Sequence, residues 1–181
     1  MAATGGPGDL ATLRGAELAS ADDVLAPTRA EMHDCPGGAL SEMDQTTLVA
    51  EVISAADSCF PDGLLVFDTA ALIGHRDNVA ATSASLAAAE TLNLPVLGWA
   101  LSEPVAAQLR QEFSFSFNGP QGVDVDLRVS IDRARQRLAA HTLQQRTLPG
   151  SARWRRLELL AETESLRWLR PPHRSPHCHA C

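Results

Sequence analysis

The chain lacks lysine and tyrosine altogether, and only 4% of its 181 residues are aromatic. All fifteen basic residues are therefore arginine, so chemistry that requires a lysine side chain is excluded. Long apolar runs are also missing, since no run approaches the roughly 18–20 residues that span a bilayer. The first residues have neither the basic start nor the apolar core of a secretory signal, so we expect a cytoplasmic protein without a transmembrane segment. Its four cysteines then give little reason to expect a disulfide framework.

Charge is divided unevenly along the chain, whose net charge is −7. Residues 1–123 hold four arginines against sixteen acidic residues, a net charge of −12. Residues 124–181 hold eleven arginines against six acidic residues, a net charge of +5. This asymmetry is typical of a basic tail that binds an acidic partner, or of an acidic domain onto which its own basic tail folds.

Apolar patterning predicts an α/β domain over residues 41–145. Residues 64–67, LLVF, form a short continuous apolar run, which is typical of a strand buried on both faces of a parallel sheet. A helical pattern over 77–93 and a second strand at 94–101 complete a strand-helix-strand unit, whose crossover is almost always right-handed. A further helix is expected at 41–58. We therefore expect a small parallel sheet of the three-layer α/β/α type.

The remaining segments flank this unit. Residues 1–40, rich in Gly and Pro, are predicted to be mostly flexible, although LATLRGAELAS could form a short helix. The pattern over 151–170 predicts a basic amphipathic helix, and residues 171–181 form a His- and Cys-rich tail. Beyond residue 101 the pattern predicts a helix at 102–113, a strand at 123–130 and a second helix at 131–145.

Asp68 directly follows the first apolar run. Side chains at the carboxyl end of a parallel strand point into the crevice where open α/β sheets bind ligands. A carboxylate at that position can hold a metal ion, orient a base or take up a proton. The alternative is a strand-end residue that caps the following turn through its side-chain oxygen.

The opening of the unit resembles that of the isochorismatase-like cysteine hydrolases. LLVFD, followed by NVAATSASLAAAETLNLPVL, is similar to that family's first strand, helix and second strand over residues 64–99. Of the family's catalytic Asp, Lys and Cys, only the Asp has a match, at Asp68. Ala70 stands where the family commonly has Gln. The resemblance thus implies a catalytically inactive relative, a non-catalytic interaction or assembly protein with a protein partner or a second copy of itself.

A second resemblance is to the PIN-type metal-dependent ribonucleases. Their first strand commonly runs into Asp-Thr-Ser-Ala-Leu-Ile, and LLVFDTAALI is similar. Glu103 lies about where that family places a second acid. The resemblance implies Mg²⁺ or Mn²⁺ bound by Asp68 and Glu103, with an activated water attacking a phosphodiester. The family's later acids have only loose counterparts, at Asp124, Asp126 and Asp132.

The predicted basic helix is a candidate surface for a partner. Arginine beside tryptophan suits stacking on RNA bases, and an amphipathic basic helix also suits a protein groove. The alternative is a helix that docks its tryptophans on the domain while its arginines pair with the acidic half. The candidate partner-binding residues are Arg153, Trp154, Arg155, Arg156, Arg167, Trp168 and Arg170.

The tail is a candidate zinc site, because imidazole and thiolate are the ligands that Zn²⁺ prefers. Its spacing matches no closed zinc motif, although His33 and Cys35 could complete one. The alternative is an unstructured end. The candidate ligands in the tail are His173, His177, Cys178, His179 and Cys181.

Overall fold

The computed structural model describes residues 7–25, 31, 39–68, 76–113, 126–142 and 150–172. The chain divides into two compact units. Residues 1–34 and 130–163 form the first unit, and residues 35–129 and 164–181 form the second. The predicted zinc ligands of the tail, His33, Cys35 and Asp124 lie outside the described residues.

The second unit holds nearly all of the sheet. Within the described residues, four strands form one mixed sheet in the order β1-β2-β4-β3. β1 and β2 are parallel, with Leu64 opposite Val96, as the strand-helix-strand prediction required. β2 and β4 are antiparallel, so the sheet is mixed and not wholly parallel, while the predicted α/β class is confirmed. The strands are β1 (Leu64–Phe67), β2 (Val96–Ala100), β3 (Leu127–Ser130) and β4 (Thr163–Arg170).

The helices of the second unit begin and end close to their predicted limits. Asp44 caps α2, where its carboxylate accepts a hydrogen bond from the backbone N–H of Thr47 at 3.0 Å. Pro104 lies in the first turn of α4, where its missing N–H is tolerated. The elements are η1 (Leu40–Glu42), α2 (Gln45–Cys59), α3 (Arg76–Leu92) and α4 (Glu103–Glu112).

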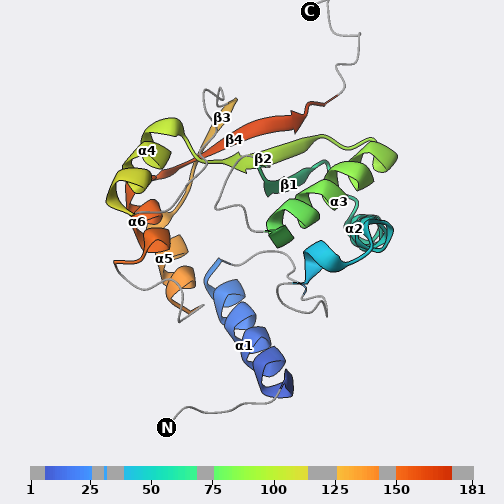
Figure 1. The fold of residues 1–181 in the computed structure, drawn as a ribbon, viewed down its shortest axis with the longest axis horizontal. Helices are drawn as coiled ribbons and strands as arrows, with labels where there is room; N and C mark the ends of the chain where they lie inside the picture. The colour runs from blue at the N-terminus through green and yellow to red at the C-terminus, as the bar shows by residue number, and fades with distance from the viewer. Residues whose placement is uncertain are drawn as a thin grey trace, which may run out of the picture. The chain divides into compact units, whose positions relative to one another are not determined.

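Small residues set the packing of α3 and β2. Ala88 and Ala89 are completely buried on α3, which packs against both α2 and β1 (Figure 1). On β2, a Cβ added to Gly98 would lie only 2.9 Å from the Leu169 side chain of β4. The strands and helix therefore approach one another at distances that larger residues would prevent.

The first unit contains helices α1 (Pro7–Leu25), α5 (Arg133–Thr142) and α6 (Ala152–Leu159). α1, a helix of 19 residues within the segment predicted to be mostly flexible, packs against α5. Arg133 is buried and donates to the backbone oxygens of Ala161 and Thr163, just beyond the end of α6. The guanidinium thus supplies hydrogen-bond donors to the backbone carbonyls of the turn between α6 and β4.

The single basic helix predicted for 151–170 is also wrong. α6 starts as expected, with the Ser151 hydroxyl accepting from the Trp154 N–H at 3.2 Å, but it ends at Leu159. Ala161 then adopts a left-handed conformation with φ of 50°, and the chain continues as β4. Helices commonly end at a glycine in this conformation, which other residues adopt infrequently. Because Ala161 takes that place here, the sequence carries no glycine signal for the end of the helix.

None of the helices in the described part of the chain has both the length and the apolar character needed to cross a bilayer.

Candidate functional site

Asp68 takes part in a buried ion pair. The residue is only 2% exposed, and the Arg167 Nη2 donates to its Oδ1 at 2.6 Å. Its backbone N–H donates to the Trp99 oxygen of β2 at 3.0 Å. The carboxylate thus links the end of β1 to β4, two strands away, with its charge balanced by a guanidinium.

The other acids predicted to bind metal also have hydrogen-bond or ion-pair partners within the chain. Glu103 pairs with Arg110 on the same helix, and both side chains are partly exposed. Asp126 accepts from the Trp168 N–H at 2.7 Å, and Asp132 accepts from the Arg135 N–H at 3.0 Å. Among the residues that the structure describes, no three His, Cys, Asp or Glu side chains gather in a way that could hold a metal ion.

The predicted partner-binding residues do not share a helix face. Trp154, Arg155 and Arg156 lie on α6 in the first unit, where Arg155 pairs with Glu158 at 3.1 Å. Arg167, Trp168 and Arg170 lie on β4 in the second unit. Arg167 forms the ion pair with Asp68. Arg170 donates to the Leu94 backbone oxygen, and to the Asn93 side-chain oxygen at 2.8 Å. The Trp168 backbone N–H donates to the Asp126 carboxylate. Nothing is described of the Arg153 side chain.

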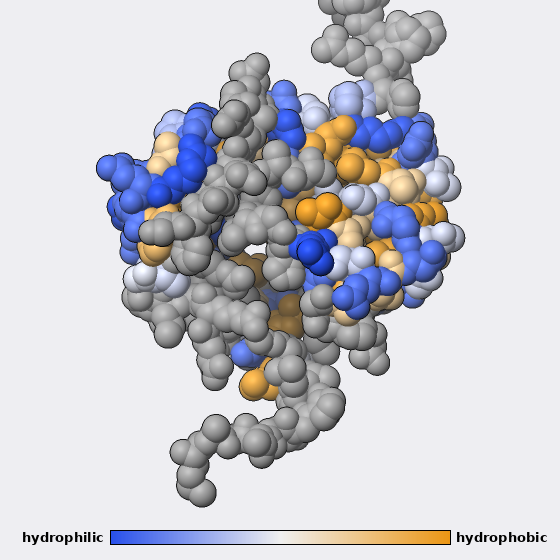
Figure 2. All heavy atoms as spheres, viewed as in Figure 1, coloured by the Kyte–Doolittle hydropathy of each residue, from blue (hydrophilic) through white to orange (hydrophobic). Residues whose placement is uncertain are grey.

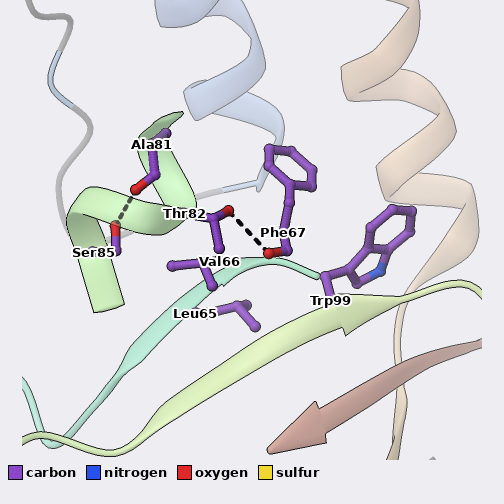
Figure 3. Close-up of a pocket in the computed structure, with 7 residues that line it drawn as sticks. All are labelled: Leu65, Val66, Phe67, Ala81, Thr82, Ser85 and Trp99. Carbon is purple, nitrogen blue, oxygen red and sulfur yellow. Dashed lines mark hydrogen bonds between the residues drawn. The ribbon is translucent and has the colours of Figure 1, made fainter. Parts of the chain in front are cut away.

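β1 is an end strand of the sheet in the described part of the chain, so its outer edge has no strand beside it there. The Leu64 N–H donates to the oxygen of Pro95, directly before β2, at 2.9 Å, and the Asp68 N–H donates to the Trp99 oxygen of β2 at 3.0 Å. Since successive residues of a strand direct their backbone groups to opposite sides, those of Leu65 and Phe67 point away from β2. Thr82 of α3 reaches the Phe67 oxygen from that side, at 3.0 Å (Figure 3).

β1 is consequently more open than the sequence predicts. Leu65 is 65% exposed and Phe67 is 42% exposed, so the prediction of a strand buried on both faces is wrong. A continuous apolar run identifies a strand but does not say which side of the sheet has a neighbour. The alternation of the strand also directs the Leu65 N–H and C=O away from β2.

A cavity of about 410 Å³ lies between this edge and α3. Its size falls within the roughly 300–1,000 Å³ of ligand pockets. α3 contributes Ala81, Thr82 and Ser85, whose small side chains leave space between the helix and β1 (Figure 3). The other lining residues are Leu65, Val66, Phe67 and Trp99. The lining is almost entirely apolar, and the Ser85 hydroxyl is already bonded to the Ala81 oxygen at 2.9 Å.

Two aromatic rings give the cavity a fixed wall. Phe67 and Trp99 extend from neighbouring strands on the same side of the sheet (Figure 3). Their rings meet edge to face, with centroids 6.2 Å apart. The Trp99 indole N–H donates to the buried Glu164 carboxylate at 2.6 Å, which fixes the ring. This wall is therefore organised before any ligand arrives.

Sequence reasoning missed this groove, which we define as the space between the outer edge of β1 and α3. The exposure of Leu65 and Phe67 depends on strand order, and no local pattern encodes that order. One signal was present, because Ala81 and Ser85 recur at helical spacing in a helix rich in small residues. Small residues at that spacing permit a helix to lie close to a strand.

Comparison with known proteins finds no matching family and no curated relative of this chain.

Proposed function

We propose that the protein is a non-catalytic interaction protein that binds an extended segment of a partner protein along β1. The observation that carries this proposal is the groove, an apolar cavity of about 410 Å³ beside a strand edge, where the alternation of β1 directs the Leu65 backbone groups outward. Extended peptides add to exposed sheet edges in this way, with backbone hydrogen bonds supplying affinity and side-chain pockets supplying specificity.

The hydrogen bond from α3 to the edge of β1 limits how much of that edge a partner strand can pair with. Because Thr82 bonds the Phe67 oxygen, the carboxyl end of the edge is closed, and the open stretch is centred on Leu65. An incoming segment can exchange two backbone hydrogen bonds with Leu65 and place an apolar side chain between Phe67 and Ser85. Aromatic rings held in place lower the ordering cost of such binding.

The arrangement of the carboxylates favours binding over catalysis. Asp68 is balanced by Arg167, and Glu103 by Arg110, so neither offers a free negative charge to a divalent cation in the described structure. The PIN-type nuclease alternative and the isochorismatase-like ancestry both stay predictions. A chain without lysine also lacks one of the three catalytic residue types of the hydrolase family.

The test is a selection of random nine-residue peptides against the full-length protein, followed by fluorescence polarisation with the strongest selected peptide. Ser85→Trp fills the cavity, and we expect it to weaken binding at least tenfold. Ser83→Trp is the matched control, because Ser83 is an exposed residue of the same helix that does not line the cavity. We expect the control to stay within twofold of the native protein.

Leu65→Pro provides a second variant that does not depend on filling the cavity. It removes the outward N–H while leaving the bonds from Leu64 to Pro95 and from Asp68 to Trp99, and edge strands tolerate proline at such positions. Circular dichroism checks that each variant is folded. The proposal fails if no peptide is selected, or if every selected peptide binds Ser85→Trp and Leu65→Pro as tightly as the native protein.

A further inference from the structure

We infer that the segment bound in the groove carries a basic residue at one end, next to apolar residues at alternating positions. This inference rests on the proposed function and adds the chemistry of the partner. The apolar part follows from the lining of the cavity, while the basic part follows from the charge at the amino end of β1.

Three exposed acids lie at or near that end of the groove. Asp62 precedes β1 by two residues, and Asp57 lies in the last turn of α2, which leads directly into β1. Glu90 lies in the last turn of α3, which leads into β2 opposite the start of β1. In Figure 2, hydrophilic side chains are interleaved with apolar ones over the region of α2 and α3.

The helix ends add to this negative field. α2 and α3 both finish near the amino end of β1, and a helix carries about half a negative charge at its carboxyl end. Neither last turn, both within the described residues, contains a basic side chain. Arg170 is the nearby cation, and it is held by the Leu94 oxygen and the Asn93 side chain at the start of β2. In the described part of the chain, three acids and two helix carboxyl ends at this end outnumber the Arg170 guanidinium.

The opposite end of the groove differs. There Asp68 is neutralised by Arg167, and the exposed Arg76 begins α3, whose amino end carries partial positive charge. Asp77 in the same turn is buried and accepts from the Ser41 N–H at 3.2 Å. The charges at this end are therefore partly balanced, whereas the three acids at the amino end of β1 are reinforced by two helix carboxyl ends. A segment with its basic residue at one end matches this polarity.

A second copy of the chain fits the groove poorly. Its own β1 would bring its own α3, because Thr82 ties that helix to the edge. Two helices would then compete for the space beside one pair of strands. Residues 39–68 contain six acids and no arginine, so the two copies would also repel each other along this edge. A separate basic and apolar segment meets neither obstacle.

The experiment uses the peptides from the same selection. We expect enrichment of arginine or lysine at one end of the selected peptides. Polarisation titrations of the strongest peptide at 20 and 300 mM NaCl (roughly 20 and 6 Å Debye lengths) should show weaker binding at high salt. Asp62→Lys should weaken binding about fivefold at low salt. Asp23→Lys makes the same change of charge on α1 in the other unit, and we expect an effect below twofold.

The possible outcomes separate the two proposals. Peptides that lose affinity in Ser85→Trp but show no basic preference and ignore Asp62→Lys would overturn this inference and leave the proposed function intact. A selection that yields no groove-dependent peptide overturns both. Sedimentation of the native protein adds the remaining alternative, since a dimer that Ser85→Trp and Leu65→Pro return to a monomer would make a second copy the occupant.

Discussion

β1 and β2 are both short apolar strands that lie side by side in parallel, yet they differ in burial and in partners. β2 has a strand on each side, and its Val96 and Ala100 are completely buried. β1 has one strand neighbour in the described structure and exposes most of Leu65. The difference teaches that apolar character determines whether a segment forms a strand, while its position in the sheet determines which of its backbone groups and side chains stay accessible to a partner. We call the side of β1 that faces β2 and β4 the closed side, and its outer edge the open side.

The largest expected effect concerns the closed side, where the Asp68–Arg167 ion pair joins β1 to β4. Arg167→Ala leaves a buried carboxylate without its guanidinium, and we expect the free energy of unfolding to fall by about 3–5 kcal/mol. Arg110→Ala is the matched control, because its pair with Glu103 is partly exposed and should contribute less than about 1 kcal/mol. Urea denaturation followed by tryptophan fluorescence measures both. If both variants lost the same small amount of unfolding free energy, the Asp68–Arg167 pair would not be a buried contact that joins the strands.

The two strands themselves supply the next test, because Leu65 and Leu97 are opposite each other in the sheet. Leu97→Pro removes a ladder hydrogen bond from a strand with neighbours on both sides, and we expect a loss of roughly 3 kcal/mol or more. Leu65→Pro removes an N–H that points outward, so its loss should stay below about 1 kcal/mol. Thermal unfolding of both variants gives the comparison. A large loss for Leu65→Pro would show that the edge already has a partner within the chain.

The smallest expected effect is on metal binding. If Asp68 is a closed structural residue, calorimetric titration of Mn²⁺ into the native protein and into Asp68→Asn should give the same result. Any contribution from the His- and Cys-rich tail is common to both proteins and cancels. Saturable Mn²⁺ binding that Asp68→Asn abolishes would instead support the nuclease alternative and place a ligand site on the closed side.

Local patterns were sufficient for much of the second unit. The strand at 64–67 matches β1, and the helices at 41–58 and 102–113 differ from α2 and α4 by a few residues at their ends. The capping carboxylate of Asp44 and the early proline of α4 act within one turn, so they can be recognised without knowing the fold. Parallel pairing of β1 and β2 followed from the helix between them.

The prediction for residues 151–170 failed because local patterns conflict there. TESLRWLR alternates Glu164, Leu166 and Trp168 with Ser165 and Arg167, a strand pattern, yet it directly continues a helical one. What separates the two elements is the left-handed Ala161, whose neighbouring carbonyl groups bind Arg133 from α5. That contact spans 28 residues and exists only in the folded chain.

By itself, the sequence determined that β1 and β2 are strands joined by a helix, that the chain is acidic in its first two thirds, and that lysine chemistry is absent. These properties depend on residue type and short-range spacing. Only the tertiary structure decided that β4 lies beside β2, that Arg167 neutralises Asp68, and that β1 keeps an open edge next to α3. Those properties depend on contacts between residues up to 99 positions apart, and such contacts form because burial and charge balance are satisfied across the whole unit and not within any one segment.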